Sequence, residues 1–262
     1  MRAPTADVVA ESVSKCFQVH GRTIQALSDV SLRLEPGSFV SIVGRSGCGK
    51  STLLRILCGL AKPTSGTVSV GGQPVAAPPR QMRYLFQDYA QSLLPWKTVE
   101  ANIEFGARHP CTPEGAAGPA ARRAVVERSL QTIELTHTAK RYPWELSGGM
   151  QQRVAIGRLL ASDPQILLMD EPFSAVDALS RANLQDVVLR LWEELRLTVV
   201  LVTHDIDEAV YLSERVIVVN ATGNGIDADV AIDLPRPRAQ VETRELPAYL
   251  DLRRRLLRLV LD

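Results

Sequence analysis

Short runs rich in apolar residues recur along the chain, and glycine or polar residues follow each of them. Residues 39–43, 166–169 and 199–202 form three such runs. Runs of this length without polar alternation are typical of strands buried on both faces of a parallel sheet. The pattern therefore predicts an α/β fold with a parallel sheet at its core.

A second pattern, apolar residues alternating with polar ones, precedes and follows the first apolar run. Val30, Leu32 and Leu34 alternate with polar residues, and residues 67–75 (TVSVGGQPV) have the composition of a hairpin. Alternation of this kind favours antiparallel strands with one buried face. We therefore expect an antiparallel β-subdomain beside the parallel core.

A helical pattern occupies the middle of the chain, from Thr98 to about Tyr142, and reappears at its end. PAARRAVVERSLQTIEL is the clearest middle segment, and residues 109–119 predict a surface loop rich in proline and glycine. The last segment, after Pro247, predicts an amphipathic helix with four arginines. Such a helix either binds anionic lipid or docks on the protein with a solvated face, and we expect docking.

These patterns predict one domain over residues 1–240 and a helical tail over 241–262. Within the domain, the parallel core and the β-subdomain occupy 1–87 and 160–240. A helical subdomain is inserted at about 88–159.

The glycine-rich segment GRSGCGKST follows the first apolar run directly. It fits the phosphate-loop pattern G-x-x-x-x-G-K-[ST], in which backbone N–H groups surround phosphates at a helix N-terminus. We expect Lys50 to reach the β- and γ-phosphates and Ser51 to place its hydroxyl on Mg²⁺. The nucleotide-binding candidates are Gly44, Arg45, Ser46, Gly47, Cys48, Gly49, Lys50, Ser51 and Thr52. The apolar residues of the helix that follows include Leu53, Leu54, Leu57 and Leu60, and ATP should exclude thiol reagents from Cys48.

The second apolar run ends in two carboxylates, Asp170 and Glu171. Ligands bind at the carboxyl ends of strands in open α/β sheets. We expect Asp170 to bind Mg²⁺ and Glu171 to accept a proton from the attacking water. The alternative for Asp170 is a helix N-cap.

Three further motifs, FQD at Gln87, LSGGMQQR starting at Leu146 and VTHD at His204, complete a set that resembles the ATP-binding cassette (ABC) family over nearly the whole chain. The resemblance implies a P-loop NTPase core, ATP hydrolysis and a head-to-tail dimer with ATP sandwiched between two copies. It assigns Phe17 to adenine stacking, Gln87 to Mg²⁺ and water, Ser147, Gly148 and Gly149 to the signature, Ser174 to Asp177 to the D-loop, and His204 to the γ-phosphate.

The residues themselves agree with the dimer that the resemblance implies. Ser147 and the two glycines after it should open a helix whose N–H groups suit an anion supplied by a second subunit. The sequence departs from the family pattern at Met150, where glutamine is frequent, and in reading SAVD where SALD is commoner. Neither departure replaces a phosphate-contacting residue.

Outside the motif context, three of these residues have ordinary alternatives. A histidine such as His204 after an apolar run is usually structural, a glutamine such as Gln87 usually faces solvent, and an aromatic such as Phe17 after a strand is usually core. The family resemblance favours the functional interpretation for each.

Composition narrows the class of protein further. Thirty basic residues against 29 acidic ones give a net charge of +1, which offers no basic excess for nucleic acid. No apolar run approaches a membrane span, and the first residues lack a signal peptide's apolar stretch. We expect a cytosolic chain, peripheral to the inner face of the cell membrane through a permease. The four cysteines lack zinc-site spacing and should be reduced.

LLPW at residues 93–96 and DLPRPR at 233–238 resemble ATPase subunits of nitrate, sulfonate and taurine importers. That likeness implies a permease helix docking near Trp96, together with a separate solute-binding protein. The alternative for Trp96 is packing at the start of the next helix. Rival functions are an exporter of lipid or lipoprotein, a non-transport ABC ATPase acting on nucleic acid or ribosomes, and a non-hydrolysing scaffold.

Overall fold

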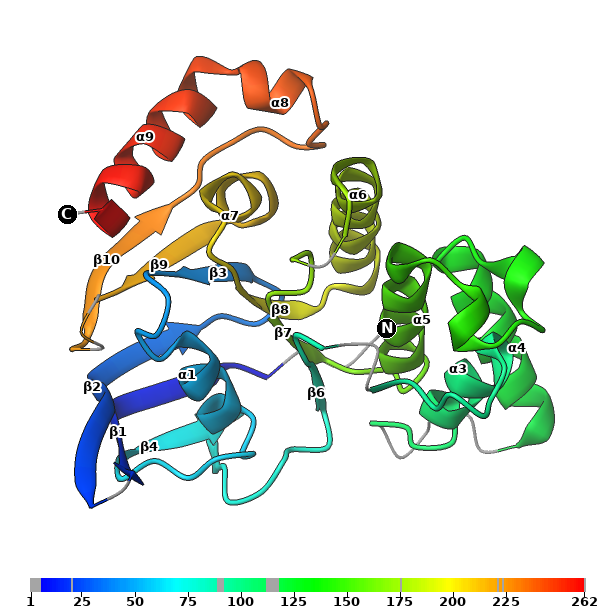
Figure 1. Ribbon diagram of the computed structural model, residues 1–262, viewed down its shortest axis with the longest axis horizontal. Coiled ribbons are helices and arrows are strands. Elements are labelled where there is room, and N and C mark those ends of the chain that lie inside the picture. The colour runs from blue at the N-terminus through cyan, green and yellow to red at the C-terminus, as the bar shows by residue number, and fades with distance from the viewer. Residues whose placement is uncertain are drawn as a thin grey trace. The chain divides into compact units, whose positions relative to one another are not determined.

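The computed structural model describes residues 6–19, 21–88, 92–111, 118–174, 176–220, 222 and 224–261. The chain forms two compact units, one made of Met1–Pro79 with Trp192–Asp262 and the other of Arg80–Leu191. Each unit has its own strands and helices (Figure 1).

The first unit contains most of the strands. Its elements are β1 (Val8–Val19), β2 (Arg22–Leu34), β3 (Phe39–Val43), α1 (Lys50–Leu57), β4 (Ser65–Val70), β5 (Gln73–Pro74), β8 (Thr198–Val202), α7 (Ile206–Leu212), β9 (Arg215–Val219), β10 (Ile226–Ala231), α8 (Glu242–Glu245) and α9 (Pro247–Leu261).

An antiparallel sheet with the order β2-β1-β4-β5 forms one layer of this unit. Its central strand β1 pairs with β2 and with β4, both antiparallel. Val30 and Leu34 point to a buried face, as their alternation with polar residues predicts. The expected antiparallel β-subdomain is therefore confirmed.

The parallel strands of the first unit place β3 between β8 and β9. All five residues of β3 and all five of β8 are buried, as the apolar runs predict. Ser41, a polar residue inside β3, is satisfied by a hydrogen bond between its hydroxyl and that of Ser213. β10 extends the sheet antiparallel to β9.

Helix α1 follows β3 and the glycine-rich loop, and it buries Leu53, Leu54 and Leu57. The inclusion of Leu60 in this helix is wrong. The helix ends at Leu57, Gly59 adopts a left-handed φ of 72°, and Leu60 is 49% exposed. The glycine reverses the chain before another turn can form.

The second unit combines two strands with several α-helices and two short 3₁₀ helices, which are labelled η. Its elements are β6 (Met82–Leu85), α3 (Val99–Ala107), α4 (Pro119–Thr132), η1 (Thr136–Thr138), η2 (Pro143–Glu145), α5 (Gly148–Leu160), β7 (Ile166–Asp170) and the greater part of α6 (Ala178–Leu195). Strands β6 and β7 pair in parallel, and α3, α4 and α5 pack against one another (Figure 1).

The predicted surface loop at 109–119 differs from the structure at both ends. Cys111 is 7% exposed and donates its N–H to the Ser162 carbonyl, and Pro119 is the first residue of α4. Proline suits that position because its missing N–H would have no partner in the first helical turn. Residues 112–117 lie outside the described residues.

Helix α9 docks on α7 and β9 (Figure 1). Tyr249 and Leu256 are buried, whereas Arg254, Arg255 and Arg258 face solvent. The expectation of a docked helix with a solvated face is confirmed. Within the described ranges, every helix is too short or too polar to span a bilayer.

Candidate active site

The glycine-rich loop at 44–52 turns tightly around the ammonium group of Lys50. This lysine is 6% exposed, and its Nζ donates to the carbonyls of Gly44 and Arg45, each at 2.8 Å. No side chain caps the start of α1, where Gly49 adopts a left-handed φ of 93°. The loop therefore ends in a helix N-terminus without a side-chain cap, the arrangement that binds phosphate.

The three glycines of the loop have different surroundings. A Cβ on Gly49 would lie 2.3 Å from the Ala26 carbonyl oxygen, and one on Gly44 would lie 2.8 Å from that of Val219. A Cβ on Gly47 would meet nothing within 4 Å. Packing thus excludes side chains at Gly44 and Gly49, whereas Gly47 faces open space.

Cys48 is 2% exposed, with its Sγ 3.9 Å from the Lys50 Nζ. The fold of the loop therefore shields the thiol already, because its side chain points inward. The exclusion of thiol reagents from Cys48 by ATP stays a prediction.

His204 and the phosphate loop follow neighbouring parallel strands. Ile42 of β3 is in register with Val202 of β8, and the Thr203 N–H donates to the Ile42 carbonyl. Because the carboxyl ends of parallel strands meet at one edge, His204 lies at the same sheet edge as the loop. Its side chain is exposed.

A hydrogen-bonded turn that sequence reasoning missed shapes the backbone around His204. The Thr203 hydroxyl donates to Glu208 Oε2 at 2.6 Å and accepts from the Asp205 N–H at 3.0 Å. Asp205 caps α7 by accepting from the N–H of Asp207 at 2.8 Å. The signal was present as an N-cap aspartate before an apolar helical segment.

Phe17 lies on the last part of β1, and its side chain is 40% exposed. The Lys15 Nζ sits 5.2 Å from the ring centroid. The alternative that Phe17 is core is wrong, because the residue is exposed, and an exposed aromatic ring can stack on a flat ligand.

In the second unit, the structure brings Gln87 and Glu171 together. Gln87 Nε2 donates to Glu171 Oε2 at 3.1 Å, and both residues follow the ends of the parallel strands β6 and β7. Glu171 has a left-handed φ of 45°, which is strained for a residue with a side chain. The amide thus orients a carboxylate at the sheet edge.

Asp170 ends β7 and is 2% exposed. Its Oδ2 accepts a hydrogen bond from the Tyr84 hydroxyl at 2.8 Å. The N-cap alternative is wrong, because the next described helix begins only at Ala178. Sequence reasoning missed Tyr84, whose position depends on the register that sets it opposite Leu168.

The signature segment opens helix α5, as predicted. Ser147 is the N-cap, and its hydroxyl accepts from the Met150 N–H at 3.4 Å. A Cβ on Gly149 would lie 3.1 Å from Val176 Cγ1, a side-chain atom that can shift. One of the N–H groups expected to face an anion is therefore satisfied within the chain.

Asp177 also serves as a helix cap. Its Oδ1 accepts from the Ser180 N–H at 3.0 Å in the first turn of α6. Hydrogen bonds from the backbone and side chain of Ser180 lower the pKa of Asp177. Ser174 donates its hydroxyl to the Glu171 carbonyl, and Ala175 of the D-loop lies outside the described residues.

The candidate magnesium ligands are Ser51, Gln87 and Asp170. A hydroxyl, an amide oxygen and a carboxylate are all oxygen donors, the chemistry that Mg²⁺ prefers. Over the part of the chain that is described, no three His, Cys, Asp or Glu residues cluster as a metal site. Ser51 lies in the first unit, and Gln87 and Asp170 lie in the second.

Trp96 is 69% exposed, in the loop before α3. Other residues shape that loop: Asn102 Oδ1 accepts from the Leu94 N–H at 2.8 Å, and Thr98 caps the helix. The alternative that Trp96 fixes the helix start is therefore not supported by its contacts. Asn102, buried and unremarked in the sequence, holds the loop instead.

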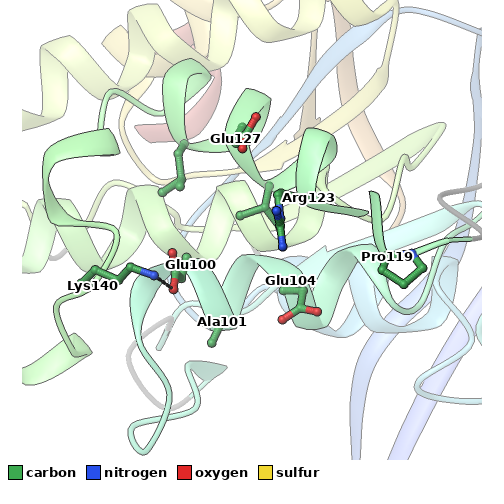
Figure 2. Close-up of a pocket in the computed structure, with 9 residues that line it drawn as sticks. Glu100, Ala101, Glu104, Pro119, Arg123, Glu127 and Lys140 are labelled. Carbon is green, nitrogen blue, oxygen red and sulfur yellow. Dashed lines mark hydrogen bonds and ion pairs between the residues drawn. The ribbon is translucent and has the colours of Figure 1, made fainter. Parts of the chain in front are cut away.

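A hollow of about 510 Å³ lies between α3 and α4, outside the predicted site. Figure 2 shows Glu100 and Glu104 of α3 with Arg123 and Glu127 of α4, and the ion pair of Glu100 with Lys140 at 2.5 Å. None of the predicted nucleotide or metal residues lines it.

A buried parallel strand leading into a glycine-rich loop with an inward lysine defines a P-loop NTPase fold, and LSGGMQQR at the start of α5 narrows it to the cassette type. The ABC transporter family matches residues 27–174, and the chain belongs to that family. The predicted fold class and family are confirmed.

Curated relatives and solved structures agree with the family. Nitrate import ATP-binding protein NrtC of Synechococcus elongatus is 46% identical over 88% of this chain and 35% of that protein. Aliphatic sulfonates import ATP-binding protein SsuB of Bacillus licheniformis is 43% identical over 93% of this chain and 90% of that protein. The dimeric structure of MJ0796, a bacterial ABC transporter cassette, has a TM-score of 0.75 at 34% identity, covering 86% of this chain and 98% of that one.

The length of the match differs among these relatives. The chain spans only 35% to 37% of the bicarbonate and nitrate relatives CmpC and NrtC.

Proposed function

We propose that this chain is the ATP-hydrolysing subunit of an importer for small organic solutes or oxyanions. The observation on which hydrolysis rests is the carboxylate of Glu171, held by Gln87 at 3.1 Å on a strained backbone directly after the buried Asp170. Support for import comes from relatives named for nitrate, bicarbonate and aliphatic sulfonates.

Lys50 and the loop backbone bind the phosphates of ATP. The ammonium group of Lys50 donates to two loop carbonyls, and it would exchange these for phosphate oxygens when ATP binds. Phe17 stacks on the adenine. Ser51, Gln87 and Asp170 would hold Mg²⁺ through their oxygen atoms, and the ion would supply positive charge beside the phosphates.

Glu171 takes a proton from the attacking water, and Gln87 orients the carboxylate for that transfer. His204, exposed at the carboxyl edge of β8, contacts the γ-phosphate. Ser147, Gly148, Gly149 and Asp177 act on the nucleotide of a second copy in a head-to-tail dimer.

The proposed partners are a second copy of this chain, a membrane permease and a separate solute-binding protein. The exposed Trp96 is the candidate anchor for a permease helix, since aromatic side chains dominate many interfaces. Attachment through the permease would place the chain at the inner face of the cell membrane.

Phosphate release by the purified chain tests the proposed hydrolysis. Glu171→Gln should retain ATP binding and lose roughly 10²–10⁴-fold in turnover, because only the proton acceptor is removed. Glu127→Gln in the hollow between α3 and α4 is the matched carboxylate control and should hydrolyse normally. Near-normal turnover by Glu171→Gln would remove Glu171 from this role.

Co-purification with the permease tests the partner. Trp96→Ala should leave hydrolysis by the isolated chain unchanged and weaken assembly by about 2 kcal/mol or more. Trp96→Phe should restore most of the assembly, because a ring remains. Equal recovery of permease with wild type and Trp96→Ala would place the interface elsewhere.

A further inference from the structure

The helix that follows His204 is tied to the C-terminal helix by a cluster of polar contacts. Helix α7 starts at Ile206, and Asp207 in its first turn faces α9. The Tyr249 hydroxyl lies 3.0 Å from Asp207 Oδ1 and 3.1 Å from the Asp207 carbonyl oxygen. Arg253 Nε donates to both carboxylate oxygens of Asp207, at 2.8 and 3.1 Å.

Burial makes Tyr249 the stronger member of this cluster. The residue is 1% exposed, and burial together with the Asp207 carboxylate raises the pKa of Tyr249 above its usual range. The phenol therefore remains a hydrogen-bond donor throughout the working pH range. The Arg253–Asp207 ion pair is more exposed and contributes less.

The other end of α7 is held by the segment that leads to α9. Arg238 is 8% exposed, and its Nη1 donates to the carbonyls of Val210, Tyr211 and Ser213 at 3.2, 2.7 and 2.8 Å. These carbonyls belong to the end of the helix, where no intrahelical donors remain. The short helix is thus fixed at both ends by residues beyond β10.

Helix α9 also reaches the phosphate loop. The Leu261 carbonyl accepts a hydrogen bond from Arg45 Nη2 at 3.1 Å. One helix therefore contacts both the second residue of the phosphate loop and the helix that follows His204. Arg254 on the same helix pairs instead with Asp251 of α9.

We propose that Tyr249 and Arg253 are positioning residues for hydrolysis: through Asp207 they fix α7, and α7 fixes the turn that presents His204. This inference rests on the proposed ATPase function. Tyr249 acts indirectly and makes no covalent bond, because it contacts Asp207 and not the nucleotide.

ATP turnover by Tyr249→Phe and Arg253→Met tests the inference, with Arg254→Met as the matched control on the same helix. Tyr249→Phe should lower kcat about tenfold while KM for ATP stays unchanged, because misplacement of a reacting group slows chemistry without weakening binding. Arg253→Met should show the same split with a smaller loss, and Arg254→Met should match wild type.

A double-mutant cycle separates positioning from general stability. In a His204→Ala background, Tyr249→Phe should cause no further loss of kcat, since the group it positions is gone. Equal losses of kcat in both backgrounds, or an unchanged kcat in Tyr249→Phe, would overturn the proposal. Helix α9 would then serve only to pack against α7. A wild-type chain without ATP turnover would instead overturn the proposed function itself.

Discussion

The phosphate loop and the signature segment are both glycine-rich turns that open a helix, yet the two helices begin differently. Helix α1 begins at left-handed Gly49 without a side-chain cap. Helix α5 begins after Ser147, whose hydroxyl accepts from the Met150 N–H. The first helix start is built for a ligand, whereas the second is partly satisfied within its own chain.

The glycines of the two segments also differ in the atoms that surround them. Backbone oxygens block a Cβ at Gly44 and Gly49, but only side-chain atoms lie near a Cβ on Gly149. Backbone moves less readily than a side chain, so we expect a Cβ to disturb the phosphate loop more than the signature segment.

The largest expected effect comes from Gly49→Ala. A left-handed residue with a side chain costs about 1–2 kcal/mol, and the collision with the Ala26 oxygen at 2.3 Å adds to it. ATP binding should therefore be lost in a fluorescent-nucleotide titration. Gly47→Ala has a similar φ without the collision and should lose less affinity. Equal affinities for the two variants would show that the close approach to the Ala26 oxygen does not restrict the phosphate loop.

Lys50→Met should weaken ATP binding by about 1.5–3 kcal/mol, the usual contribution of a hydrogen bond to a charged group. The same titration measures it. Arg55→Met, on the solvent side of α1, is the control and should bind ATP normally. Affinity retained in Lys50→Met would mean that the ammonium group stays on its loop carbonyls.

Ser147→Ala should lower the unfolding free energy by about 1 kcal/mol, because the N-cap of α5 is lost. Thermal melts of the chain without nucleotide measure this, and Ser147→Thr should preserve most of the stability. An unchanged melt in Ser147→Ala would show that the cap contributes nothing and that the signature helix start is as open as that of α1.

The smallest expected effect concerns pH and the anchoring of α5. Hydrogen bonds from Arg153 of α5 and Arg190 of α6 lower the pKa of Glu134. The stabilisation is therefore present above the ordinary glutamate pKa of about 4.3 and disappears as pH falls through the lowered value. Glu134→Gln should cost less than about 1 kcal/mol at pH 7, because about half of the Glu134 side chain is exposed to solvent.

Denaturant unfolding at pH 7 and pH 3 measures this difference. Wild type and Glu134→Gln should converge at the lower pH. A stability difference between the two proteins that grows at pH 3 would contradict a lowered pKa for Glu134.

The strands and the phosphate chemistry are predictable from sequence because each depends on neighbours along the chain. Apolar runs predict β3, β7 and β8, and the motif after β3 predicts the glycine-rich loop that leads into α1. Local signals also misled: Leu60 continues the helical spacing, but Gly59 has already ended the helix.

The supporting contacts depend on register and on packing between distant segments, which no local pattern encodes. Tyr84 meets Asp170 only because β6 and β7 pair in parallel at one register. Tyr249 meets Asp207 only because α9 docks on α7. The inward direction of the Cys48 thiol follows likewise from the closed form of the loop.

Mixing two inactive variants tests whether the phosphate loop of one copy works with the signature of another. Lys50→Met disables one loop, and Gly149→Asp places a charge at the other chain's signature. In a head-to-tail dimer, the mixed preparation contains one intact pair of loop and signature. The account predicts that mixing restores ATP turnover that neither variant shows alone. No turnover in the mixture, with wild-type chain active under the same conditions, would contradict it.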